Sequence, residues 1–182
     1  MDKKEDIKYV LDKDMERFDD YIERADNKAN FLLTISGALI IAIFFQGNEL
    51  ITKLESSEIK FIMFIIIAIT IFFLAKTIYF SLQVIIPRTS NKNEESLFYF
   101  ESVKKYETGN LSKKIKLCSE EDIFTDLSKQ VSQLAKICSS KMNNVKKASN
   151  SLVISIFAIV SLVVIYLLNN FWTLINLYKY NF

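Results

Sequence analysis

Three long apolar segments alternate with polar ones along this chain. They cover residues 31–47, 60–86 and 152–172; the second begins with Lys60 at the loop boundary and is interrupted once inside, by Lys76. A helix needs about 20 apolar residues to cross the hydrocarbon core of a bilayer. Each segment therefore predicts a transmembrane helix. The expected fold class is all-α: an integral membrane protein with about three transmembrane helices and a cytoplasmic helical stalk or bundle.

The polar segment 1–30 predicts an amphipathic helix. No glycine or proline separates it from the first apolar segment, so we expect one continuous helix through both. Its apolar residues recur at helical steps of three, four or seven. They are Ile7, Leu11, Phe18, Ile22, Ala25 and Ala29.

The polar segment 87–151 begins with a helix breaker and continues as further helices. Pro87 follows the second apolar segment and is expected to end that helix at Ile86. A short helix after it, over LFYFESVKKYE, is expected to stop at Gly109. Ser119, with Asp122 three residues later, forms a candidate N-cap for the next helix.

The helix after Ser119 is expected to run for about fifty residues, into the third apolar segment. A second element must cover its apolar stripe. We expect Ile78, Leu82 and Ile85 to supply part of that cover. Packing within one chain and packing between protomers both stay open, and a stripe that continues into a span favours a homo-oligomer. The stripe consists of Ile123, Leu127, Val131, Leu134, Cys138, Met142, Val145, Ser149 and Leu152.

Lysine and arginine decide the orientation in the bilayer, because positively charged loops stay in the cytoplasm. Segment 1–30 holds seven of them and segment 87–151 holds twelve, whereas the first loop holds two and the C-terminal tail one. We therefore expect the N-terminus and segment 87–151 in the cytoplasm, and the first loop and the C-terminus outside.

The composition argues against catalysis. The chain has no histidine, two cysteines and three glycines. It therefore lacks the usual residues of a Ser-His-Asp triad, of a zinc site and of a glycine-rich phosphate loop. We expect no catalytic residues, no cofactor, no metal and no enzymatic activity. A net charge of +2 also gives no reason to expect a nucleic-acid polymer as partner.

Several polar residues near the apolar segments are candidate functional positions. Arg24, Asp26, Asn27 and Lys28 lie where the first span begins; they form either an ordinary charged boundary or a cluster that binds an anionic ligand. Lys76 either reaches the membrane surface or faces a water-filled path. Both interpretations stay open on these residues alone.

Basic and small residues form further groups. Lys146 and Lys147 precede the third span, where anionic lipid is the expected partner. Lys113, Lys114 and Lys116 form either a solvated surface or a phosphate contact. A small-residue patch on the first span permits close helix packing. Its members are Ser36, Gly37, Ala38 and Ala42.

Four sequence elements carry a resemblance to a known family. They are RADNKANFLL at 24–33, PR at 87–88, LFYF at 97–100 and DLSKQVSQLAKICSSK at 126–141. In this order they resemble the transmembrane effectors of Pycsar, a bacterial anti-phage system. The resemblance extends from about residue 21 to residue 168.

The resemblance implies a function without catalysis. A neighbouring cyclase would make cyclic CMP or cyclic UMP on infection. The effector would respond by assembling in the inner membrane and impairing it, which causes abortive infection. On this resemblance the ligand or gating candidates are Arg24, Asp26, Asn27, Lys28, Lys76, Pro87 and Arg88. The alternative is a membrane-anchored, non-enzymatic scaffold or sensor that signals through its helical stalk.

Overall fold

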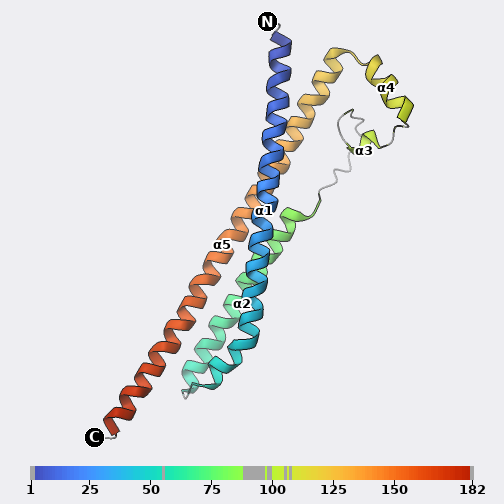
Figure 1. Ribbon diagram of the computed structural model, residues 1–182. Helices are drawn as coiled ribbons and strands as arrows, with labels where there is room; N and C mark the ends of the chain where they lie inside the picture. Colours follow the sequence, from blue (N-terminus) through green and yellow to red (C-terminus); the bar gives the residue numbers. More distant parts are fainter. Residues whose placement is uncertain are drawn as a thin grey trace. The chain divides into compact units, whose positions relative to one another are not determined.

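The computed structural model describes residues 3–54, 56–87, 97, 100–104, 106 and 108–180. These residues form five helices, whose order along the chain can be followed in Figure 1: α1 (Lys3–Thr52), α2 (Ser57–Ile85), α3 (Phe100–Val103), α4 (Thr108–Leu117) and α5 (Glu120–Tyr180). Helices α1, α2 and α5 are each long and apolar enough to cross a membrane. The predicted fold class, all-α with three spans, is confirmed. Where the bilayer begins and ends along these helices stays a prediction.

The chain divides into two compact units. We name residues 1–26 with 86–142 the polar unit, and residues 27–85 with 143–182 the span unit. Helices α1 and α5 each pass from one unit into the other. The polar unit also holds α3 and α4, and the span unit also holds α2.

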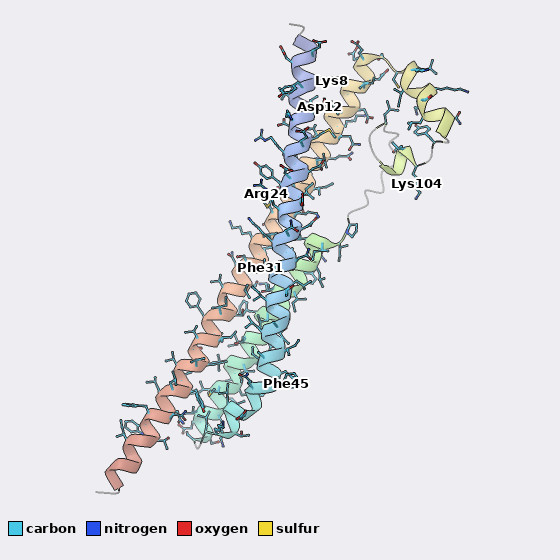
Figure 2. The ribbon with its side chains drawn as sticks, viewed as in Figure 1. Lys8, Asp12, Arg24, Phe31, Phe45 and Lys104 are labelled. Carbon is cyan, nitrogen blue, oxygen red and sulfur yellow. The ribbon has the colours of Figure 1, made fainter. Side chains whose placement is uncertain are left out.

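Helix α1 runs from Lys3 to Thr52 without a break, which confirms the predicted continuity of the N-terminal helix and the first span. Charged side chains are frequent on its first half, and apolar side chains on its second. Figure 2 shows Lys8, Asp12 and Arg24 on its first half, and Phe31 and Phe45 on its second. The two phenylalanines are strongly exposed, as expected of side chains that contact lipid.

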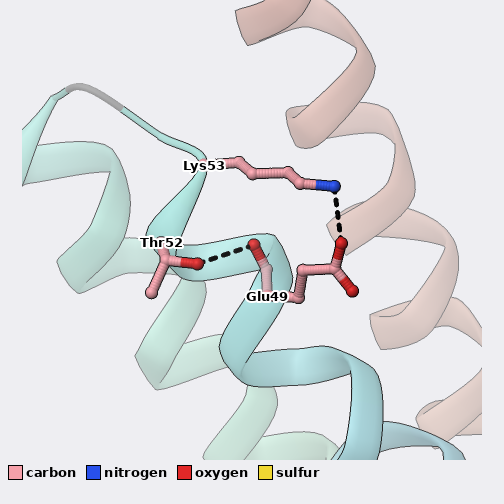
Figure 3. A network of polar contacts seen from close by, with 3 residues as sticks. All are labelled: Glu49, Thr52 and Lys53. Atoms are coloured by element: carbon pink, nitrogen blue, oxygen red, sulfur yellow. Dashed lines mark hydrogen bonds and ion pairs between the residues drawn. The ribbon is translucent and has the colours of Figure 1, made fainter.

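The C-terminal end of α1 is closed by local polar contacts (Figure 3). The Thr52 hydroxyl donates a hydrogen bond to the Glu49 carbonyl oxygen, 3.0 Å away. The Lys53 ammonium lies 2.6 Å from a Glu49 carboxylate oxygen. The hydrogen bond from Lys53 to the Glu49 carboxylate raises the pKa of Lys53 above its ordinary value. A cation therefore stays at the negative end of the helix dipole, where it is favourable.

The buried face of α2 differs from the predicted one. Leu82 is 42% exposed, and Ile78 and Ile85 are only half-buried. The predicted packing face was therefore wrong for Leu82, whereas Ile78 and Ile85 are covered only in part. Three small hydroxyl residues and three larger apolar residues lie inward instead, and the small ones let neighbouring helices approach closely. The buried residues are Met63, Thr70, Leu74, Thr77, Ser81 and Val84.

An apolar cluster lies in the span unit where the loop joins α1 to α2. Leu54, Met63 and Leu162 are buried at its centre. Residues from all three helices of the unit pack against them: Leu50, Ile59, Ile66, Ile67, Ile165 and Tyr166. This cluster fixes α1, α2 and α5 to one another at that end of the unit.

Helix α5 spans 61 residues, so it is longer than the predicted fifty, but it is continuous as predicted. Its buried stripe departs from the apolar pattern. Lys141 is buried where Met142 was expected, and Ala148 where Ser149 was expected. Gln130 similarly takes the place predicted for Val131. A helix of 3.6 residues per turn shifts its inward face by a residue over several turns, and a polar residue with a partner can occupy that face.

The short helices differ from the sequence-based expectation. Helix α3 ends at Val103, and Gly109 lies inside α4 rather than at the end of a helix. The prediction that Gly109 stops a helix was wrong. Gly109 occupies the first turn of α4, where backbone N–H groups have no intrahelical acceptor to lose. A glycine there breaks no helix.

A reciprocal cap begins α5 and confirms the predicted N-cap. The Asp122 amide donates to the Ser119 hydroxyl at 3.2 Å, and the Ser119 amide donates to the Asp122 carboxylate at 3.1 Å. The Ser119 hydroxyl also donates to that carboxylate, at 2.6 Å. Two amides at the helix start are thereby satisfied.

Removing this cap is expected to fray the first turn of α5. A Ser119→Ala substitution should cost about 1 kcal/mol of local stability, because the Asp122 amide loses its acceptor. Amide exchange in residues 120–123 is expected to speed up about fivefold. Ser119→Thr keeps the hydroxyl as acceptor and donor and serves as the control. Equal exchange in Ser119→Ala and the unsubstituted protein would contradict a stabilising role for the cap.

Candidate functional site: an interhelical ion pair in the polar unit

An ion pair joins the two long helices of the polar unit. The Lys141 ammonium on α5 donates to both carboxylate oxygens of Asp26 on α1, at 2.5 and 2.7 Å. The Lys141 side chain is only 10% exposed and that of Asp26 35% exposed. The two residues are 115 positions apart in sequence. The pair is thus a long-range tertiary contact rather than a helix surface pair.

The burial of the Lys141 ammonium makes its pairing with Asp26 necessary for stability. An ammonium removed from water is costly unless a counter-charge and hydrogen bonds replace its hydration. Asp26 supplies both to Lys141. Ala25, the neighbour of Asp26 on α1, is fully buried, as is expected where helices approach closely. The pair therefore fixes how α1 and α5 align in the polar unit.

A second polar contact ties the connection before α3 to α5. The Leu97 amide donates to a carboxylate oxygen of Asp126 at 2.7 Å. Leu97 is the first residue of LFYF, and Asp126 is the first residue of the DLSKQ element. Asp26 and Lys141 likewise belong to two of the elements that carry the family resemblance. Both contacts thus end on the element at 126–141, which meets LFYF through Asp126 and RADNKANFLL through Lys141.

The other candidate residues take no part in this ion pair. Arg24 is exposed in the polar unit, and Asn27 and Lys28 are exposed in the span unit. Lys76 is exposed and lies 5.8 Å from the centre of the Phe73 ring, a cation–π distance. Pro87 is exposed just after α2. Arg88 lies outside the described residues.

Lys141 and Asp126 were missed by the sequence analysis. The candidates named from the sequence are charged residues next to or inside apolar segments, whereas Lys141 lies in the middle of a helical stripe. One signal was available: Lys141 fits the helical spacing of the buried stripe as well as Met142 does. A lysine is buried at such a position only when it has a partner. That partner is not identifiable without the fold.

A groove is also present in the polar unit, between the beginnings of α1 and α5. Its volume is about 590 Å³. Three of its four charged residues are acidic, so it repels a phosphate. Its lining consists of Glu5, Ile7, Lys8, Glu120, Glu121, Ile123, Phe124 and Leu127. Across the part of the chain that the structure describes, no group of three or more His, Cys, Asp or Glu residues is placed to hold a metal ion.

The Pycsar effector protein domain matches residues 10–168 of this chain. The chain belongs to the Pycsar effector family. The match covers α2 completely and includes both members of the Asp26–Lys141 pair. The resemblance drawn from the sequence elements is thereby confirmed.

A curated relative supports the same assignment. The Pycsar effector protein SaPycTM of Staphylococcus aureus is 28% identical to this Pycsar family member over 130 residues. The alignment covers 70% of this chain and 76% of the relative. No solved structure matches the chain.

Proposed function

We propose that this protein is an anti-phage effector that responds to cyclic CMP or cyclic UMP by assembling in the bacterial inner membrane and impairing it. Infected cells would stop growing or die before phage matures, which is abortive infection. The observation that carries this proposal is the family match over residues 10–168, which includes all of α2 and most of α1 and α5. The protein acts in this proposal without catalysis.

The charge distribution supports the orientation in this proposal. The segments before the first span and between the second and third spans hold most of the lysine and arginine residues. The polar unit would thus lie in the cytoplasm, where a cyclase product accumulates. The C-terminal end of α5 would lie outside the inner membrane.

The nucleotide would act by shifting a population of states. It must bind the assembled state more tightly than the resting state, or it changes nothing. The acidic groove between α1 and α5 does not suit a cyclic phosphate. Arg24 is an exposed cation, and Lys141 already neutralises the nearby Asp26. Among the described residues of the polar unit, Arg24 is thus the exposed cation that the family resemblance also names, and we take it as the phosphate contact to test.

Membrane potential in living cells tests this proposal. The protein is co-expressed with a pyrimidine cyclase, and a potential-sensitive dye reports depolarisation. We expect depolarisation only when both proteins are active. A cyclase variant without activity is the control, and membrane fractions verify that the effector is inserted. A polarised membrane, with the effector inserted and the nucleotide measured in the cell, would overturn the nucleotide response and favour a membrane-anchored scaffold.

A further inference from the structure

Among the described residues, six hydroxyl side chains are buried inside the span unit. All three of its long helices contribute, and every one of these residues is at least 96% buried. We name the set the hydroxyl seam. It consists of Ser36 on α1, Thr70, Thr77 and Ser81 on α2, and Ser151 and Ser155 on α5.

Most of the seam hydroxyls are satisfied by their own helix rather than by a neighbouring one. A contact between helices comes from Thr77, whose hydroxyl also lies 3.4 Å from the Ala148 carbonyl oxygen on α5. A hydroxyl bonded to its own helix keeps that bond when helices move apart. The intrahelical bonds are Ser36 to Leu32, Thr70 to Ile66, Thr77 to Phe73, Ser151 to Lys147 and Ser155 to Leu152, at 2.7–3.0 Å.

Ser81 lacks this local satisfaction. Its side-chain oxygen is fully buried and has no hydrogen-bond partner among the described residues. It lies one turn from Thr77 on the same inward face of α2. A buried hydroxyl without a partner costs free energy, which a water molecule or a hydrated ion would recover. Ser81 thus indicates that the seam is suited to water.

The inner face also holds Met63, Leu74 and Val84 beside the hydroxyl residues, whereas large apolar side chains dominate the outer face. It carries large apolar side chains that are 63–80% exposed, and these suit lipid tails. They do not suit the wall of a water-filled path, because an apolar constriction of this kind excludes water. Examples are Phe31, Phe44, Phe64, Phe72 and Phe157.

We infer that the hydroxyl seam lines the water-filled path through which monovalent ions leak when this protein impairs a membrane. Association of intact span units would surround a path with phenylalanine and isoleucine. Helices α1, α2 and α5 must therefore separate from one another, so that the seam meets water while the outer face stays in lipid. This inference rests on the proposed membrane-impairing function and goes beyond it by naming the lining of the path.

Cysteine accessibility tests the inference in the full-length protein. The native thiols are first removed as Cys118→Ser and Cys138→Ala, and this parent must depolarise cells with the co-expressed cyclase. Ser36→Cys, Ser81→Cys and Ser155→Cys are then compared with Ile71→Cys and Phe157→Cys, whose native residues are exposed on the outer face. A charged, membrane-impermeant methanethiosulfonate reagent is added before and during depolarisation.

We expect the reagent to modify the seam cysteines at least tenfold faster during depolarisation than at rest, and to leave Ile71→Cys and Phe157→Cys unmodified in both states. Depolarisation with unreactive seam cysteines, or with reactive outer-face cysteines, would overturn the seam as the path. A parent that is inserted but never depolarises cells would overturn the proposed function, and the inference with it. The two failures are distinguished before any labelling begins.

Discussion

An Asp26→Lys variant is expected to lose about 2 kcal/mol of stability and its response to the cyclase. The substitution leaves Lys141, which is nearly buried, facing a second cation instead of its carboxylate partner. Truncating one member of a hydrogen-bonded charge pair costs roughly 1–3 kcal/mol. The thermal midpoint in detergent should fall by about 4–8 °C. The reversed pair, Asp26→Lys with Lys141→Asp, should recover most of that loss.

The matched control for this experiment is a surface pair on the same helix. Lys13 and Glu16 on α1 lie 2.6 Å apart, three residues along the helix, and both are exposed. Glu16→Lys should change stability by less than about 0.5 kcal/mol, because water screens such pairs. An equal loss in both single variants, or no recovery in the reversed pair, would show that Asp26 and Lys141 do not stabilise one another.

An Ala148→Leu variant is expected to destabilise the span unit by about 1–3 kcal/mol, the usual cost of forcing extra methylene groups into a packed interior. Ala148 is fully buried, and the Thr77 hydroxyl lies 3.4 Å from its carbonyl oxygen. A leucine there must push α2 away from α5. Thermal unfolding in detergent and the amount of protein in the membrane fraction measure the loss.

Ala42→Leu provides the same chemical change at an exposed position of α1 in the span unit. Its side chain would add apolar area toward lipid without a steric conflict, so stability should stay within about 0.5 kcal/mol. If Ala148→Leu unfolds at the same temperature as Ala42→Leu, then α2 and α5 do not pack as closely as the structure places them.

The helices were predictable from sequence because their signals are long and simple. Extended apolar runs predict spans, and the near absence of glycine and proline predicts continuous α1 and α5. The buried face of α2 was not predictable, because that helix is apolar on nearly all sides. Its apolar pattern therefore does not indicate which face is buried. Thr77 and Ser81, its small polar residues, were the better guide because close packing selects small side chains.

The candidate site was predictable only in part. Asp26 was found because it lies beside the first span, but its partner Lys141 is 115 residues away. Apolar periodicity predicts that Met142, rather than Lys141, is buried. The tertiary contact with Asp26 reverses this, and Lys141 is the buried residue. Gly109 shows the same limit in a short helix. Its position in the first turn of α4, rather than its residue type, decides its effect.

Reconstitution tests the central claim most directly. The purified protein is inserted into liposomes that contain a self-quenching dye, and cyclic CMP, cyclic UMP or the corresponding linear monophosphate is added. The account predicts dye release with at least one cyclic pyrimidine nucleotide and none with the linear compounds. It also predicts a loss of release in Asp26→Lys that the reversed pair restores. Liposomes that stay sealed with both cyclic nucleotides, although the inserted protein is folded, would contradict a nucleotide-triggered membrane effector.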